Sequence, residues 1–276
     1  MAERECTDAR MTAAIALAEK TGAPANQRMD VTLNNLSLGF RRTAEPEKAE
    51  LLLQCAVAIR VKAVGPEDPS LASSLANLAG VYRERGDYSR AEALYKRSLE
   101  VSGRAAKPDP IETVFILNAL AMVYEADGRA TAAEPLYAKA LDVSEHAFGR
   151  DSQFVSARLQ SFAAFYQRQG QHGQAEELYR RSLAIEEKTY GLNHPSLSET
   201  LNSLGMVYRV QGKTALAEEA FKRSLANLGS SPYPNRFVLA KTLDGLAATY
   251  RAEGRDTEAE KLESQAANIR ATIQRR

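Results

Sequence analysis

The sequence repeats itself at an interval of 42 residues, and this periodicity constrains the fold more than any other feature. A leucine recurs six times in one frame, and an aromatic residue follows each leucine seven positions later. The leucines are Leu33, Leu75, Leu117, Leu159, Leu201 and Leu243, and the aromatic residues are Phe40, Tyr82, Tyr124, Tyr166, Tyr208 and Tyr250. Self-similarity at such a period indicates a solenoid, in which each repeat buries its apolar face against its neighbours.

Within one repeat, the pattern predicts two amphipathic helices joined by a tight turn. In the second repeat an apolar stripe of helical spacing runs from Leu75 to Tyr82, the pattern breaks at Gly86, and a second stripe starts at Ala91. Apolar residues three and four apart, interrupted by glycine, are typical of a helical hairpin. The sequence therefore predicts an all-α fold.

The turn of the first repeat departs from this pattern. Glycine stands at the turn of five repeats, where it can adopt a positive φ, but Ala44 takes its place in the first. Pro46 follows at a position that suits the first turn of a helix. We expect a slightly different loop at Ala44.

The repeat frame predicts the domain organisation. Residues 4–20 are in phase with the second helices, so residues 1–24 are expected to form a capping helix, equivalent to half a repeat, over the first repeat. Residues 25–273 are expected to form one continuous solenoid. Its repeats are predicted at about 26–67, 68–109, 110–151, 152–193, 194–235 and 236–273.

Composition excludes several classes of partner. Lys and Arg number 36 and Asp and Glu 35, so the chain lacks the basic excess typical of proteins that bind nucleic acid or anionic membranes. Its apolar residues form no run long enough to span a bilayer, and the first residues do not resemble a secretory signal. We expect a cytoplasmic protein, with Cys6 and Cys55 as free thiols.

The sequence offers no recognisable catalytic chemistry. It contains no glycine-rich phosphate loop, no Ser or Cys beside a plausible His base, and no cluster with metal-ligand spacing. His194 is interpreted as a loop residue before Pro195. We therefore expect neither enzymatic activity nor a bound cofactor or metal.

The repeat resembles a known family. The order Leu-x-x-Leu-(Ala/Gly)-x-x-Tyr, Gly, Ala, then Leu-Tyr-x-x-(Ala/Ser)-Leu is similar to the tetratricopeptide repeat, whose usual length is 34 residues. With HPSL at 194–197, LNNL at 33–36 and AEPLYAKAL at 133–141, the sequence resembles the 42-residue repeats of kinesin light chain and its bacterial relatives. The resemblance implies a right-handed α-solenoid superhelix of six helix-turn-helix repeats, whose first helices line a concave groove.

Polar side chains recur on the face of the first helices that is turned away from the core. The resemblance implies that this face binds an extended peptide. Carboxamides can hold a peptide backbone because they both donate and accept, and arginines can grip carboxylates. The candidate groove residues are Asn34, Arg41, Asn77, Arg83, Asn118, Gln160, Gln167, Asn202, Arg209 and Lys241.

The expected function is thus a protein interaction scaffold that binds an extended, acidic or amphipathic peptide of a partner protein. Two alternatives remain open: a structural or self-assembling scaffold, and a sensor whose superhelix tightens around a peptide signal. The polar final helix argues against end-to-end growth, so a monomer is favoured.

Overall fold

The structure, a computed structural model, describes residues 8–20 and 29–274. Regular structure in these residues is helical. The chain divides into two compact units, Met1–Val143 and Ser144–Arg276, and the division falls within helix α7. The repeat boundaries expected from the sequence stay predictions. Residues 1–7 and 21–24 of the expected capping helix, and residues 25–28 of the expected solenoid, lie outside the described residues.

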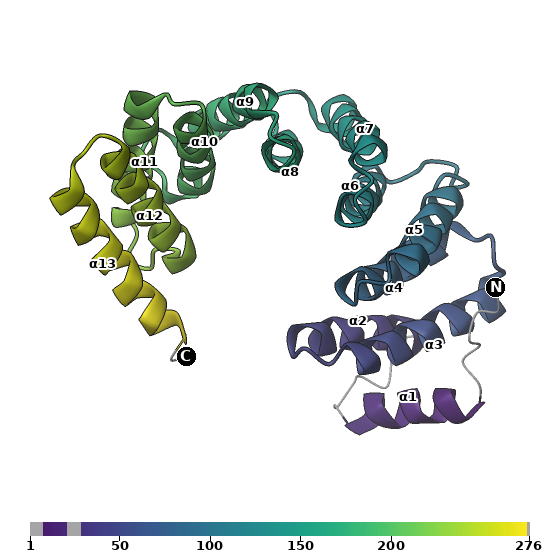
Figure 1. The fold of residues 1–276 in the computed structure, drawn as a ribbon. Helices are drawn as coiled ribbons and strands as arrows, with labels where there is room; N and C mark the ends of the chain where they lie inside the picture. Colours follow the sequence, from purple (N-terminus) through teal and green to yellow (C-terminus); the bar gives the residue numbers. More distant parts are fainter. Residues whose placement is uncertain (1–7, 21–28, 275–276) are drawn as a thin grey trace. The chain divides into compact units, whose positions relative to one another are not determined.

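Unit 1 is built from consecutive helices that pair with their neighbours (Figure 1). Helix α2 packs against α3, and α4 packs against α5. The helices are α1 (Asp8–Lys20), α2 (Met29–Arg42), α3 (Pro46–Val64), the short 3-10 helix η1 (Pro69–Leu71), α4 (Ala72–Glu84), α5 (Tyr88–Ser102), α6 (Pro110–Ala126) and α7 (Ala130–Phe148).

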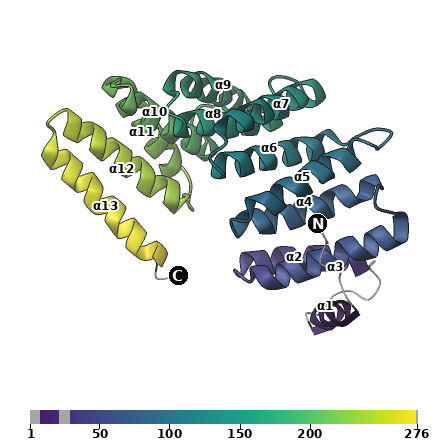
Figure 2. The same cartoon turned by 45° about the vertical axis from the view of Figure 1, so that its right-hand side comes forward.

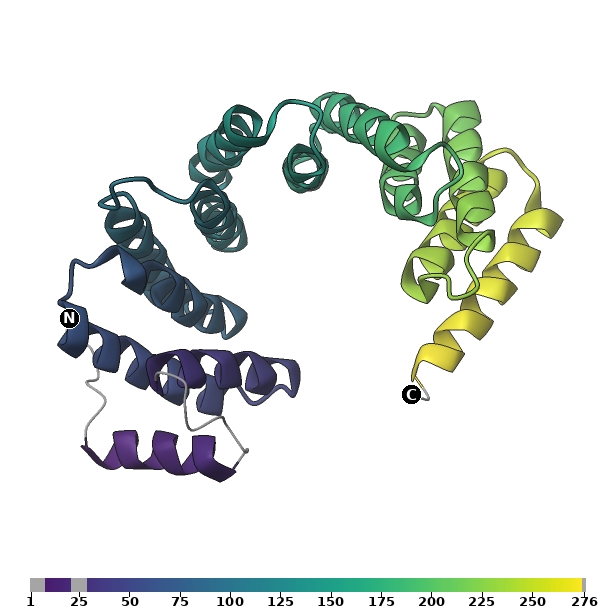
Figure 3. The same ribbon diagram turned by 180° about the vertical axis from the view of Figure 1, so that it is seen from behind.

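Unit 2 continues the same pairing. Its helices are α8 (Gln153–Arg168), α9 (His172–Tyr190), the 3-10 helix η2 (Pro195–Leu197), α10 (Ser198–Val210), α11 (Thr214–Gly229), α12 (Arg236–Ala252) and α13 (Asp256–Gln274). Helices α8 and α9, α10 and α11, and α12 and α13 form pairs. The pair α12 and α13 lies side by side in all three ribbon views (Figures 1, 2 and 3). The prediction of an all-α fold made of helix pairs is confirmed.

The core lies between and within the helix pairs, where the repeated leucines and alanines meet. Leu33 and Leu52 have no exposed surface and pack in one cluster with Ala14 of α1. Because Ala14 is itself fully buried, α1 covers part of the apolar surface that the pair α2 and α3 would otherwise expose.

The turn at Ala44 is built like the turns that use glycine, so the expectation of a different loop is wrong. Ala44 has a φ of 57°, and the equivalent glycines have φ values between 73° and 75°. The turn at Ala44 has the same two backbone hydrogen bonds as the turn at Gly86. In both, the turn residue donates to the carbonyl three residues back, and the next residue donates to the carbonyl five residues back. These bonds impose the left-handed conformation on alanine.

Ala44→Gly is expected to raise the free energy of unfolding by about 0.5 to 1 kcal/mol. Alanine in this conformation is strained by about 1 to 2 kcal/mol, part of which is offset because glycine loses more entropy on folding. Urea denaturation measures the change. The control is Ala138→Gly on the exposed side of α7, where the same substitution should lower stability by about 1 kcal/mol. A loss of stability at both positions would contradict the account of the turn.

The structure also bears on the expectations for the cysteines and for membrane-spanning segments. Cys55 is disulfide-bonded, so the expectation of a free thiol is wrong at this position, and Cys6 lies outside the described residues. In residues 8–20 and 29–274, no helix combines the length and apolar character needed to cross a membrane.

Candidate peptide-binding face

The candidate residues Asn34, Arg41 and Asn77 form bonds between α2 and α4. The Asn77 side-chain amide donates to the Asn34 side-chain oxygen at 3.1 Å. Arg41 on α2 forms an ion pair with Glu84 on α4, and its Nε lies 3.1 Å from the carboxylate. A Cβ on Gly80 would lie 3.2 Å from the Arg41 guanidinium, so the bare backbone there leaves room for this pair. These side chains link α2 to α4.

Met122 on α6 is the common neighbour of the remaining candidates in unit 1. The Arg83 guanidinium lies 3.3 Å from the Met122 sulfur, and the Asn118 amide nitrogen lies 3.7 Å from the same atom. The Asn118 side-chain oxygen is buried and has no hydrogen-bond partner among the described residues. Arg83 and Asn118 are both partly exposed.

In unit 2, two of the predicted groove amides are bound between repeats. The Gln160 amide nitrogen lies 3.0 Å from the Thr200 hydroxyl and 2.6 Å from the Glu186 carboxylate. Asn202 is buried, and its side-chain oxygen accepts from the Thr242 hydroxyl at 3.3 Å. Both amides therefore connect successive first helices.

The remaining candidates of unit 2 are Gln167, Arg209 and Lys241. In the third, fourth and sixth repeats, the side chain at the position shared by Gln167 and Arg209 binds the residue twelve positions later in the second helix. The Tyr179 hydroxyl donates to Gln167 at 3.1 Å. Arg209 has no such bond: its Nε is buried and has no hydrogen-bond partner within the described residues. Lys241 is exposed on the adjacent first helix, α12.

The same bond forms in the third and sixth repeats. In the first and second repeats, Arg41 instead pairs with Glu84, and the Arg83 guanidinium lies near the Met122 sulfur. The Tyr137 hydroxyl donates to Glu125 at 3.1 Å, and Arg251 binds Glu263 through two bonds of 2.8 Å. In the fifth repeat the residue twelve positions after Arg209 is Phe221, whose ring has no polar atom. The Nε of Arg209 is therefore left without a hydrogen-bond partner among the described residues.

Two glycines make room for the Phe221 ring. A Cβ on Gly205 of α10 would come within 2.6 Å of the ring, and one on Gly245 of α12 within 2.5 Å. One period of 42 residues earlier in the sequence, the positions of Gly205, Gly245 and Phe221 are occupied by Ala163, Ser203 and Tyr179. Phe221 is fully buried between α10 and α12. The Phe221 ring, which has no hydroxyl, is thus accepted by Gly205 of the fifth repeat and Gly245 of the sixth, and the Arg209 Nε has no hydrogen-bond partner among the described residues.

The sequence analysis missed a ladder of glutamates that joins successive repeats. An Ala-Glu pair recurs near the start of each second helix, where the helix dipole favours a negative charge. In the structure, four of these glutamates also pair with a cation from the turn of the next repeat. The pairs are Glu50 with Arg85, Glu92 with Arg129, Glu176 with Lys213, and Glu218 with Arg255. The recurrence of Lys or Arg a few residues after the turn-facing tyrosine was the signal that could have revealed it.

Glu92 shows the electrostatics of this ladder most clearly. Burial raises the pKa of its carboxyl, but hydrogen bonds from Arg129, Lys96 and Tyr124 outweigh that effect and lower the pKa to about 2. The Tyr124 hydroxyl donates to it at 2.9 Å, and Arg129 and Lys96 both lie 2.6 Å away. The folded state therefore binds the ionised form of Glu92 in preference to the protonated form.

Glu92→Gln is expected to lower the free energy of unfolding at pH 7 by about 1 to 2 kcal/mol, since solvent screens part of the ion pairing. Because the folded pKa lies below the ordinary value of 4.5, this stabilisation is complete above about pH 5 and is lost as the pH falls towards about 2. Urea denaturation of both proteins between these values measures the difference. A difference that grows on acidification would contradict the assignment.

Arg158 on α8 is a further buried residue that the sequence analysis did not single out. Burial lowers the pKa of its guanidinium, and its Nε has no hydrogen-bond partner among the residues that the structure describes. The equivalent residues of the other repeats are Thr32, Ser74, Ile116, Thr200 and Thr242. An arginine among short side chains was the available signal.

The described residues contain no recognisable metal site. Within residues 8–20 and 29–274, no three His, Cys, Asp or Glu side chains come together as a metal site. The polar groups of the candidate face are amides and guanidinia, which suit hydrogen bonding to a peptide and to carboxylates.

The helix pairs and the polar face of the first helices define a helical repeat protein. Models of the tetratricopeptide repeat match residues 28–103 and 155–230, and a further model of the same repeat matches residues 116–153. The chain belongs to the tetratricopeptide repeat family, and its repeats are of the kinesin light chain-like type.

Solved structures share this fold. BtubC (BKLC) from P. vanneervenii is 24% identical with a TM-score of 0.68, and the match covers 91% of this chain and 93% of that one. A Podosopora anserina putative kinesin light chain with nearly identical TPR-like repeats is 25% identical with a TM-score of 0.63, over 76% of this chain and 100% of that one.

A third solved structure has a higher TM-score at lower identity. It is the STAND protein PH0952 from Pyrococcus horikoshii, which has a tetratricopeptide repeat sensor. It is 16% identical with a TM-score of 0.72, over 97% of this chain and 43% of that one. A search of curated proteins gives no match. Family and fold support a role as a protein interaction scaffold.

Proposed function

We propose that the protein is a non-catalytic interaction scaffold and that the first-helix face of unit 2 binds an extended acidic peptide of a partner protein. Arg209 carries this proposal. Its Nε is buried without a hydrogen-bond partner in the described part of the chain, whereas Arg251 at the same position of the next repeat is bound to Glu263. A buried donor without a partner is costly, and a carboxylate from a ligand would satisfy it.

Neighbouring side chains support the same ligand chemistry. Lys241 adds an exposed cation on α12, and Met206 on α10 is a partly buried apolar side chain that could contact an apolar residue of the peptide. Asp244, the acidic residue of this face on α12, is paired with Arg270 and so repels an acidic ligand less. Because Glu199 of α10 is exposed on the same face, acidic residues of the peptide are expected to lie nearest Arg209 and Lys241.

In unit 1, Arg83 and Asn118 are the best candidates for a contact with the same kind of ligand. Both are partly exposed, and Asn118 keeps a side-chain oxygen without a partner among the described residues. Asn34, Asn77 and Arg41 would have to exchange an existing bond for one to the peptide.

Arg209→Gln is expected to weaken binding of acidic peptides by about tenfold, the loss expected when one charge-assisted hydrogen bond is removed. Fluorescence anisotropy with a panel of labelled 15-residue peptides, acidic, basic and neutral, measures it. Arg251→Gln is the matched control and should leave the affinity unchanged.

Three outcomes would contradict the proposal. The first is that basic peptides bind as tightly as acidic ones, and the second is that no acidic peptide of the panel binds. The third is that the two arginine variants lose affinity equally. Melting curves of both variants exclude a loss of fold as the cause.

A further inference from the structure

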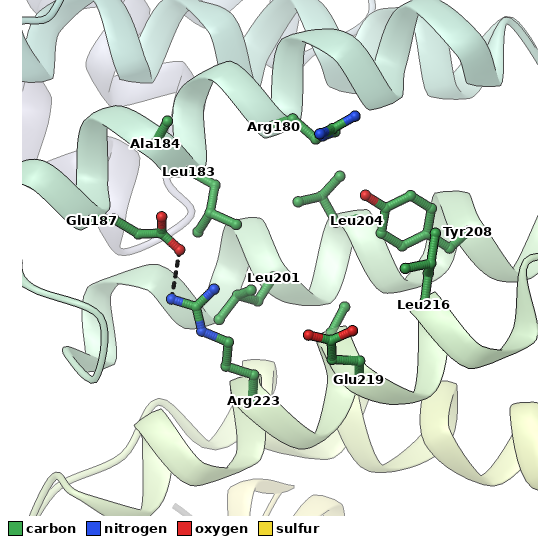
Figure 4. A pocket seen from close by; sticks show the side chains of 11 residues that line it. Arg180, Leu183, Ala184, Glu187, Leu201, Leu204, Tyr208, Leu216, Glu219 and Arg223 are labelled. Atoms are coloured by element: carbon green, nitrogen blue, oxygen red, sulfur yellow. Dashed lines mark ion pairs between the residues drawn. The ribbon is translucent and has the colours of Figure 1, made fainter.

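A pocket opens on the second-helix side of unit 2, between α9 and α11, with α10 beneath it (Figure 4). Its volume is about 400 Å³. Leu201 and Leu204 of α10 contribute apolar surface from below. Glu187 and Arg223 stand at one end and form an ion pair of 2.5 Å, while Tyr208 and Leu216 stand at the other end. The pocket thus has leucines at its base and charged side chains along its rims.

The first departure from the repeat pattern at this pocket removes a large side chain. Ala220 of α11 lines the pocket, and leucine stands at the equivalent position of the other five repeats. Those leucines are Leu52, Leu94, Leu136, Leu178 and Leu262. The change from leucine to alanine leaves a methyl group in place of an isobutyl group. The fifth repeat therefore lacks one leucine side chain where the pocket opens.

The second departure adds apolar surface at the rim. Leu216 is 44% exposed, and the equivalent residues are polar in four repeats and alanine in one. They are Lys48, Arg90, Ala132, Gln174 and Glu258. Both departures increase the apolar surface that an external group can reach, which is unfavourable unless something covers it.

The charges on the two rims are available to a ligand. Arg180 on α9 is 68% exposed, and its carboxylate neighbour Glu176 lies 4.0 Å away, whereas Lys213 lies only 2.7 Å from Glu176. On the opposite rim, Glu219 of α11 is exposed and forms no ion pair within the described residues (Figure 4). One rim therefore offers a cation and the other an anion.

We propose that this pocket binds one leucine-sized apolar side chain from an amphipathic helix of a partner protein. The helix lies between α9 and α11, a carboxylate on one of its sides meets Arg180, and a cation on the other side meets Glu219. Leucine size follows from the side chain that Ala220 lacks, and the charge pattern follows from the two rims. This site is separate from the first-helix face around Arg209 and does not depend on it.

The test is a differential selection from a displayed library of helical peptides. The wild-type protein is the target, and the library is first depleted on the Ala220→Leu variant, in which the side chain carried by the other repeats fills the pocket. Selected peptides are expected to carry a Leu, Ile or Phe flanked by an acidic and a basic residue. Their affinity should fall at least tenfold for Ala220→Leu.

Three further variants locate the contact. Arg180→Glu should weaken peptides with the acidic flank, and Leu216→Gln, which introduces the residue found in the fourth repeat, should weaken all selected peptides. Arg209→Gln should leave their affinity unchanged, so the proposed acidic-peptide face is tested separately. Should Ala220→Leu not fold, Leu216→Gln takes its place in the depletion step.

The proposal is overturned if no peptide distinguishes the wild type from Ala220→Leu. It is also overturned if the selected peptides lose affinity for Arg209→Gln but not for Ala220→Leu. Light scattering over a concentration series tests a second copy of the chain as the occupant. Self-association of the wild type that Ala220→Leu abolishes would assign the pocket to that copy and contradict the proposed partner.

Discussion

Phe221→Ala is expected to lower the free energy of unfolding of unit 2 by about 3 to 5 kcal/mol. The ring is fully buried in the cluster that joins α10, α11 and α12. Because Gly205 and Gly245 have no side chains that could move into the space, the variant would leave a cavity that its surroundings cannot fill. The loss should therefore lie in the upper part of the range for aromatic truncation.

Urea denaturation followed by circular dichroism measures this loss. The matched control is Phe237→Ala, because Phe237 is 64% exposed on α12 and its truncation should change stability by less than about 0.5 kcal/mol. Gly245→Ala is expected to destabilise as well, by about 1 to 3 kcal/mol, although alanine is the better helix former. A neutral Gly245→Ala would show that the ring does not need this space.

Leu33→Ala is expected to cost about 2 to 5 kcal/mol in unit 1. Leu33 has no exposed surface and belongs to the cluster that includes Leu52 and Ala14. Since α1 contacts only a small part of α2 and α3, a cavity in this cluster should loosen α1 first. Hydrogen exchange of the α1 amides should therefore accelerate more than exchange elsewhere in unit 1.

Leu38→Ala on the same helix is the control for Leu33→Ala. Leu38 is 41% exposed, so its truncation should change stability by less than about 0.5 kcal/mol. Equal losses at the two positions would contradict the assignment of the core to the leucine frame.

The helix pairs could be predicted from the sequence because the 42-residue frame fixes which residues face the core. Leu33, Leu75 and Leu201 are buried as the frame requires. The conformation of the turn at Ala44 could not be predicted from the sequence. Residue preference favours glycine at a positive φ, but the two backbone hydrogen bonds of the turn decide the conformation. The hydrogen bonds that close the turn outweigh the preference of alanine for a negative φ.

The candidate face was harder to predict, because its hydrogen bonds join residues far apart in the sequence. Asn34 and Asn77 are separated by 43 positions, and Asn202 and Thr242 by 40. A helical wheel places such residues on a face but does not show that they bind one another. The offset of twelve residues between Arg209 and Phe221 could have been read from the sequence, since four of the other five repeats carry a polar residue at that spacing. These residues are Tyr95, Tyr137, Tyr179 and Glu263.

The most direct test of the proposed function is whether the Arg209 guanidinium binds an acidic peptide. Nitrogen-15 NMR of the arginine Nε–H groups, during titration with an acidic 15-residue peptide, follows each guanidinium separately. The account predicts a large shift and slower solvent exchange for the Arg209 resonance, with little change for Arg251, which Glu263 already holds. A shift of Arg251 with Arg209 unchanged would contradict it.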